Sequence, residues 1–384
     1  MFSPGLALSS KRGRMVQSGS CLITIGWIAC LALAVPSLQV RAEDSLDYGL
    51  LQLRNIDTPD SAMSVAVDDG FAFIADRSRL QVADISDLES PQLVGGVIIP
   101  DGASKVVVQG TRAFIEGDQV LTAVDISNPS LPVIVGTISG LRSVTLAGEL
   151  ACALGDSELV VVDLSNPVVP AIVGRVLIGG KDLELPIASQ VAVAGTIAYI
   201  TGRARHSGTW KEVGFFQIVN FSDPTNPITV STSWSPYTIY SALAATGGYL
   251  YIASCGFLTI MDTSDPASPA PLASIFLNAP VTNVSANGSF ASVTTEGSPG
   301  SPGRDVLVLD VSEPSEPEIK LLLPTPGPAN GVDMGGLHVF VADGSFGLQM
   351  ANIWDAMSTL VGALDTPSFA WEKVAWRGSC LRDR

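Results

Sequence analysis

Few side chains in this sequence are of the types that usually perform catalysis. The chain has 384 residues but only 2 His, which limits general acid–base chemistry and metal binding by imidazole. His206 lies in an insertion, and His338 occupies a repeated position held elsewhere by Phe71 or Ile197, so we expect His338 in a half-buried strand. Nucleophile-elbow, phosphate-loop, Cys-x-x-Cys and His-Glu-x-x-His motifs are all missing from the sequence. It therefore predicts no catalytic residues and no cofactor.

The acidic and sulfur-containing residues do not suggest a metal site or a nucleophile either. Asp68-Asp69-Gly70 and Asp101-Gly102 lack the alternating oxygen ligands and the distal Glu of a calcium-binding loop. We therefore predict no metal site. Cys152 aligns with Phe73 and Tyr199 in a repeated pattern, so we interpret it as a core residue rather than a nucleophile.

A cationic cluster is the first candidate for binding. Residues 202–214 form an insertion on a chain whose formal net charge is −16 at pH 7. An anionic chain repels phosphate backbones, which excludes nucleic acid as the expected partner. Loops on a rigid scaffold often carry recognition, and Trp and Arg are favoured interface anchors. We expect contacts to a protein or surface polymer from Arg203, Arg205, His206, Trp210 and Lys211.

A row of mostly polar residues is the second candidate. They alternate with valines at the start of short Val/Ala-rich segments, as strand residues with one packed face do. If these strands converge, the row could hold a small polar ligand or only ordered water. The candidates are Ser64, Lys105, Ser143, Gln190, Asn283 and Asp333.

The elements that would position both candidates belong to a repeat. A segment of the form Leu-x-Val-x-Asp occurs seven times, and its closing Asp or Asn positions are 41, 38, 57, 42, 48 and 42 residues apart. The insertion at 202–214 accounts for most of the long interval. A period near forty over seven copies indicates a repeat architecture. The closing residues are Asp84, Asp125, Asp163, Asn220, Asp262, Asp310 and Asn352.

Each copy contains four strand-like segments. In the second copy these are Lys105–Gln109, Arg112–Ile115, Leu121–Asp125 and Val133–Ile138, with a glycine at the first reversal and Asn128-Pro129 before the fourth strand. No segment shows a sustained helical period. Four antiparallel strands in about forty residues are typical of a β-propeller blade. The sequence predicts an all-β propeller of seven blades over residues 46–365, with eight blades as the alternative.

The propeller fold would bring the polar row together. The innermost strand of each blade lines the central channel, and its residues alternate between the channel and the blade packing. We expect the valines of the row to pack and the polar residues, together with Ala242 and Gly331, to face the channel. Such a channel is narrow and mostly neutral, with Lys105 as its cation and Asp333 as its anion.

Two segments could close the ring. Leu51–Ile56 resembles a fourth strand that comes before the first full copy, and Leu360–Ala363 resembles a fourth strand of the last copy. Residues 366–384 are expected to form a tail, or the start of an eighth copy.

The repeat resembles a known family. Leu159–Pro167, with the sequence Leu-Val-Val-Val-Asp-Leu-Ser-Asn-Pro, is similar to the motif of the LVIVD-repeat proteins, and the similarity extends over about residues 46–365. This resemblance implies a propeller in a secreted or surface setting. It carries over no catalytic residues, because the family has no agreed catalytic motif.

The first 42 residues predict export. Lys11, Arg12 and Arg14 precede an apolar run, and Val40-Arg41-Ala42 follows as a cleavage site. A retained membrane anchor and a lipoprotein at Cys30 are the alternatives, and a membrane would be a partner only if the segment is retained. Cleavage would leave a net charge of −20 and three cysteines, Cys152, Cys255 and Cys380, an odd number.

These features together predict an exported, non-catalytic propeller that is extracellular, on the cell surface or periplasmic. It would bind a partner through loops and the channel mouth. The alternative is a propeller enzyme of the hydrolase or lyase type that acts at the central channel.

Overall fold

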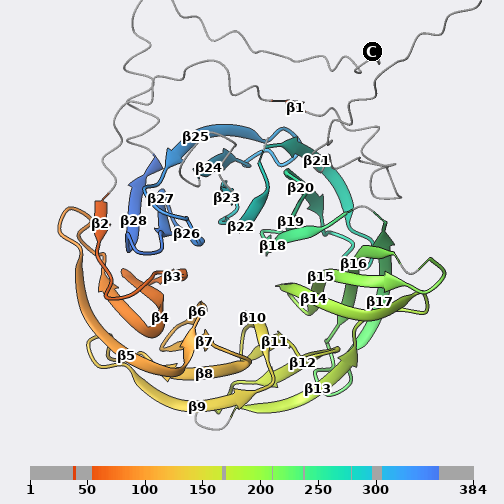
Figure 1. Ribbon diagram of the computed structural model, residues 1–384, viewed down its shortest axis with the longest axis horizontal. Coiled ribbons are helices and arrows are strands. Elements are labelled where there is room, and N and C mark those ends of the chain that lie inside the picture. The colour runs from red at the N-terminus through yellow and green to blue at the C-terminus, as the bar shows by residue number, and fades with distance from the viewer. Residues whose placement is uncertain are drawn as a thin grey trace, which may run out of the picture.

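The computed structural model describes residues 38–39, 54–166, 170–209, 211–236, 238–277, 279–295 and 305–353. These residues form seven antiparallel sheets arranged as the blades of a closed β-propeller (Figure 1). The all-β class and the choice of seven blades over eight are thereby confirmed. In the described residues no helix is long and apolar enough to cross a membrane.

Within each blade the strands follow in chain order from the channel outward, except that the outermost strands of blades 5 and 7, β1 and β2, come from the N-terminal part of the chain. Blade 1 contains β3 (Ser64–Asp68), β4 (Phe71–Asp84) and β5 (Gln92–Ala103); blade 2 contains β6 (Lys105–Gln109), β7 (Arg112–Glu116), β8 (Val120–Asp125) and β9 (Val133–Ser139); blade 3 contains β10 (Arg142–Ala147), β11 (Leu150–Leu154), β12 (Glu158–Asp163) and β13 (Ala171–Leu177); blade 4 contains β14 (Leu183–Ala194), β15 (Ile197–His206), β16 (Glu212–Asn220) and β17 (Ile228–Ser235).

The remaining three blades repeat the plan. Blade 5 contains β18 (Tyr240–Thr246), β19 (Tyr249–Ser254), β20 (Phe257–Asp262) and β21 (Ala270–Phe276), and β1 (Leu38–Gln39) pairs in parallel with β21; blade 6 contains β22 (Val281–Ala286), β23 (Phe290–Thr295), β24 (Asp305–Asp310) and β25 (Glu318–Pro324); blade 7 contains β26 (Gly331–Gly335), β27 (His338–Ala342), β28 (Leu348–Asn352) and β2 (Arg54–Ile56).

Blade 1 has three strand labels because β4 supplies two of its strands. The first half of β4 pairs with β3, and the second half pairs with β5. Arg77 lies between the halves with a left-handed φ of +48°, which lets the chain reverse there. The blade is therefore equivalent to its four-stranded neighbours.

The hydrophobic core lies between blades. Seven clusters of buried residues each join two consecutive blades, including one between blades 7 and 1. In the cluster of blades 3 and 4, Leu154 and Val161 of one blade pack with Ile200 and Phe215 of the next. Because a single blade cannot bury both of its faces, its stability depends on both neighbours.

The N-terminal strand closes the ring. β2 runs antiparallel to β28, with Arg54 opposite Met350 and Ile56 opposite Leu348. β26 in turn contacts β3 of blade 1. Of the two expected closing segments, the N-terminal one therefore occupies the fourth-strand position of blade 7. The segment 360–363, the tail 366–384 and all of the predicted signal segment except β1 lie outside the described residues.

The repeated Asp ends the third strand of a blade by capping the next turn. The backbone N–H of Ser165 donates to Asp163 Oδ1 at 2.8 Å, and Ser127 does the same to Asp125. Asn220 accepts an equivalent bond from Ser222 at 2.8 Å, so Asn can replace Asp in this role. Hydrogen bonds from Ser165 hold the pKa of Asp163 below its ordinary value. The motif's Asp is thus explained by turn geometry.

Candidate functional site

The innermost strands surround a central cavity of about 610 Å³. The strands β3, β6, β10, β14, β18, β22 and β26 lie nearest the ring axis (Figure 1). All six polar residues of the row line this cavity, as the alternation predicted: Ser64, Lys105, Ser143, Gln190, Asn283 and Asp333.

The other phase of the alternation packs between blades. Val106, Val144 and Val191 are buried, with 4% or less of their surface exposed. The expectation was wrong for Ala242, which is 1% exposed and packs in the core of blades 5 and 6. The register shift before Ala242 does not explain this, because β14 and β22 have the same shift before Gln190 and Asn283, which do line the cavity. Gly331 is buried as well and does not line the cavity.

Several polar side chains of the row bond to the next blade. Ser64 Oγ accepts from the backbone N–H of Val106 at 3.4 Å, and Ser143 Oγ accepts from that of Val191 at 3.2 Å. Gln190 Nε2 donates to the carbonyl of Ser241 at 3.0 Å. These bonds hold the inner strands of adjacent blades together.

The two charged residues of the row bond in the same way. Lys105 Nζ donates to the carbonyl of Val144 at 3.1 Å. Asp333 accepts from the backbone N–H of Val67 in blade 1 and from Ser285 Oγ in blade 6, both at 2.9 Å. Among the described residues, Asn283 is the one member of the row without such a bond. Five of the six candidates therefore also hold the ring together.

Burial shifts the pKa of both charged residues, Lys105 and Asp333. It lowers the pKa of the Lys105 ammonium, and the carboxylate of Glu116 partly opposes this. Burial also raises the pKa of Asp333, although its hydrogen bonds oppose the rise. Both shifts disfavour the charged form, as expected for groups removed from water.

Glu116 lines the cavity but was not among the sequence candidates. It is the register partner of Lys105 in the hairpin of β6 and β7. The tight turn after Gln109 pairs that residue with Arg112, and counting back along both strands leads to Lys105 and Glu116. Register counting from the predicted glycine turn could therefore have found it.

The insertion of blade 4 is an extended hairpin rather than a loop. β15 and β16 continue past the ring with Arg203 opposite Gly214 and Arg205 opposite Glu212, so the expected loop is corrected to paired strands. Arg203 also forms an ion pair with Glu212 at 3.4 Å.

The hairpin carries four of the five predicted interface residues together. Arg203, Arg205 and Lys211 are exposed, and the ring of His206 packs on Trp234 with centroids 4.2 Å apart. Trp210 lies outside the described residues. Exposed apolar residues of β14 and β17 belong to the same extended sheet, namely Leu185 at 69%, Ile187 at 49% and Trp234 at 39% exposure.

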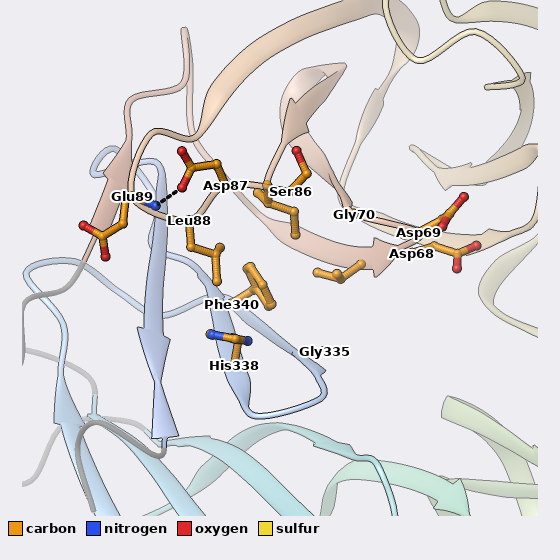
Figure 2. A pocket seen from close by; sticks show the side chains of 12 residues that line it. Asp68, Asp69, Gly70, Ser86, Asp87, Leu88, Glu89, Gly335, His338 and Phe340 are labelled. Carbon is orange, nitrogen blue, oxygen red and sulfur yellow. Dashed lines mark hydrogen bonds between the residues drawn. The ribbon is translucent and has the colours of Figure 1, made fainter. Parts of the chain in front are cut away.

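A cleft between blades 7 and 1, of about 560 Å³, was not predicted from the sequence. Figure 2 shows Leu88, Phe340 and His338 side by side in its middle, with Asp68 and Asp69 on one side and Glu89 on the other. Glu89 forms an ion pair with Arg54. His338 is half-buried, as expected for a strand residue. In the described chain no group of three or more His, Cys, Asp or Glu side chains could hold a metal ion.

Cys152 is a core residue, as the sequence predicted, and is not a reactive thiol. Cys152 is fully buried in the core of blades 3 and 4, and burial raises the pKa of its thiol to about 12. A thiol with that pKa is protonated at neutral pH and is a poor nucleophile. Cys380 lies outside the described residues.

Comparison with models of protein families identifies the same repeat that the sequence pattern indicated. Residues 59–98, 102–139, 141–178 and 241–275 match the family model of the LVIVD repeat. This chain is an LVIVD repeat protein. The four matches fall on blades 1, 2, 3 and 5. Blade 4 carries the extended hairpin and an Asn in place of the motif's Asp, and blade 7 also carries an Asn.

Solved structures share the fold of this LVIVD repeat protein at low sequence identity. A structure of the mitotic checkpoint complex matches with a TM-score of 0.58 and 12% identity over 82% of this chain and 98% of the other. A functionally unknown protein from Desulfotomaculum acetoxidans gives 0.57 and 12% over 74% and 93%, and the computationally designed Ika8 protein gives 0.54 and 9% over 79% and 100%. At such identities the likeness concerns the fold alone. No curated protein matches the chain.

Proposed function

We propose that this LVIVD repeat protein is an exported, non-catalytic scaffold that binds a protein or surface polymer through the extended hairpin of blade 4. The charge of the hairpin carries the proposal. Arg203, Arg205 and Lys211 are exposed cations on a chain of net charge −16. The insertion at 202–214 carries these three cations against one carboxylate, that of Glu212. Its local charge is therefore positive, which attracts anionic groups and excludes cationic ones.

The architecture of the hairpin supports the same role. Its strands continue from the blade, and Ala204 and Val213 are buried in the core of blades 3 and 4. The cations are therefore held on a rigid platform, which reduces the conformational entropy lost on binding. Exposed Ile187 and Trp234 add apolar contact area beside them, and aromatic residues with Arg are common interface anchors.

Export is part of the proposal and depends on residues 1–42, whose charge and apolar run are those of a secretory signal. N-terminal sequencing of secreted protein tests it. A mature terminus at Glu43 is expected, and a retained segment 21–35 would contradict cleavage.

Catalysis at the channel is the weaker alternative. Both charged candidates there, Lys105 and Asp333, donate to or accept from neighbouring blades. This favours a structural role for them over a role in chemistry. We propose the channel mouth as a second contact for the same partner.

A double charge reversal tests the hairpin. Arg203→Glu/Arg205→Glu should abolish capture of a partner from the native exterior, because the local field changes sign. The matched control is Arg77→Glu/Arg175→Glu. It makes the same change in net charge elsewhere on the ring, and Arg175 pairs with Glu158 as Arg203 pairs with Glu212. Capture retained by the hairpin variant, or lost equally in the control, would contradict the proposal.

A further inference from the structure

Blade 2 presents two opposite charges to the central cavity with unfilled bonding capacity. Lys105 on β6 and Glu116 on β7 are register partners, and both line the cavity. They form no ion pair with each other in the described part of the chain, since Lys105 Nζ bonds to the carbonyl of Val144 instead. The pair is thus held apart by the neighbouring blade.

Lys105 has N–H donors that form no hydrogen bond within the described residues. An ammonium group has three N–H donors, and the described chain engages one of them. The carboxylate of Glu116 nevertheless influences it, because that charge raises the pKa that burial lowers. The remaining N–H groups need acceptors from within the cavity.

Glu116 has an acceptor without a donor. Its Oε2 atom is buried and has no hydrogen-bond partner among the described residues. Buried polar atoms in folded proteins nearly always have a partner, and an unpaired carboxylate oxygen is among the most costly exceptions. Because Glu116 lines the cavity, a donor there would reach this oxygen after a rotation of the carboxylate and would remove the cost.

The rest of the lining is mostly uncharged, with apolar residues beside polar ones such as Ser104, Ser143 and Gln190. A volume of about 610 Å³ is in the range of small-molecule sites. The third charged residue of the lining, Asp333, already accepts from the N–H of Val67 and from Ser285 Oγ, so Lys105 and Glu116 set the charge of the occupant.

We propose that the central channel binds a small zwitterion of the amino-acid class. Its carboxylate accepts from Lys105 Nζ, and its ammonium group donates to the carboxylate of Glu116, a residue that lines the cavity. A simple anion would leave the carboxylate of Glu116 unpaired, and a simple cation would leave N–H donors of Lys105 without acceptors. A zwitterion satisfies both charges without changing the net charge of the site. The site does not depend on the hairpin of blade 4.

Calorimetric titration of the full chain tests this site. The probes are glycine, β-alanine and 4-aminobutyrate, which differ in the separation of their charges, with acetate and methylammonium as half-ligands. At least one zwitterion should bind saturably, at least tenfold more tightly than either half-ligand, because each half-ligand loses one charge-assisted hydrogen bond. Failure of all three zwitterions to bind would mean that water alone fills the site and would overturn the proposal.

Variants locate the site. Lys105→Met and Glu116→Gln should each weaken binding of the preferred zwitterion at least tenfold, because each removes one charge. Lys181→Met and Glu149→Gln change exposed residues of the same types and should bind as the unchanged chain does. If Glu116→Gln binds the zwitterion as tightly as the unchanged chain, the assignment of its ammonium group is wrong. Far-UV circular dichroism of each variant separates a lost fold from lost binding.

Discussion

At the scale of single residues, polar side chains in the channel connect blades. Ser64, Ser143, Gln190 and Asp333 each bond to the inner strand of a neighbouring blade. The sequence predicted that they face the channel, because strand alternation is local. It did not predict what they bond to, because their partners lie about forty residues away or, for Asp333, at the other end of the chain.

Asp333 gives the sharpest test of this role. Asp333→Ala removes the acceptor for the N–H of Val67 and for Ser285 Oγ. We expect the free energy of unfolding to fall by about 1–3 kcal/mol, the usual effect of leaving a partly buried donor unpaired. Urea unfolding measures it. Asp118→Ala, at an exposed position, is the control, and an equal loss in both variants would contradict the role.

The pH dependence of Asp333 provides an independent check. Burial raises its pKa above the ordinary 3.8, so the folded state binds this proton more tightly than the unfolded state does. Stability from this residue is therefore present below pH 3.8 and is lost as the pH rises through the folded pKa. In Asp333→Asn this loss should be missing. The free energy of unfolding of both proteins is measured against pH. Parallel curves for the two proteins would show that the carboxyl group of Asp333 does not titrate as described.

At the scale of elements, contacts between blades explain a glycine that recurs in the fourth strands, at Gly95, Gly136 and Gly174. Gly174 of β13 opposes Val161, and the register shifts immediately after this pair. A Cβ atom at Gly174 would lie 2.0 Å from the carbonyl oxygen of Pro224, in the turn of blade 4, and Gly95 meets Pro129 of blade 2 in the same way. The glycine and the Pro turn of the repeat are therefore two halves of one contact between blades.

Gly174→Ala should destabilise the ring. The added methyl would meet the backbone of the next blade, which cannot move as a flexible side chain can, so we expect a loss of about 1–3 kcal/mol. Thermal and urea unfolding measure it. Gly155→Ala is the matched control, because its nearest atom would be 3.5 Å away, an ordinary contact. If the two variants were equally stable, the contact between blades would not be tight.

At the scale of the whole molecule, the ring is closed by strands from the two ends of the described chain. Asn55 of β2 lies opposite Gln349 of β28, and Gln349 Nε2 donates to Asn55 Oδ1 at 3.1 Å. Every blade junction has its own core cluster, and that of blades 7 and 1 includes Ile56. Opening this junction exposes two blade faces at once, so closure governs the stability of the whole ring.

A disulfide between these strands should stabilise the protein. Asn55→Cys/Gln349→Cys, oxidised, would close a loop of nearly three hundred residues, and chain-entropy arguments give a gain of about 5–6 kcal/mol over the reduced form. Gln109→Cys/Arg112→Cys, within one hairpin of blade 2, closes a very short loop and should gain about 2 kcal/mol or less. Melting temperatures with and without reductant measure both. A similar rise in melting temperature for the two disulfides would contradict the role of ring closure in the stability of the whole protein.

The sequence by itself determined the repeat, the strands of each blade, the family and the channel-facing row. These depend on alternation, turn residues and periodicity, which act within a few residues and recur in seven copies. The sequence also placed the cations of residues 202–214 in one insertion, but as a loop, since nothing local distinguishes an irregular loop from strands that continue past the ring.

Only the tertiary structure decided the remaining features, because each depends on a contact between blades. It selected the N-terminal strand to close the ring, paired Asp333 with Val67 and Ser285, and placed Ala242 in the core of blades 5 and 6. It also drew Lys105 toward Val144 and left Glu116 Oε2 unpaired in the same cavity. Such contacts join residues that are distant in the chain, and their energies are set by packing that no local pattern encodes.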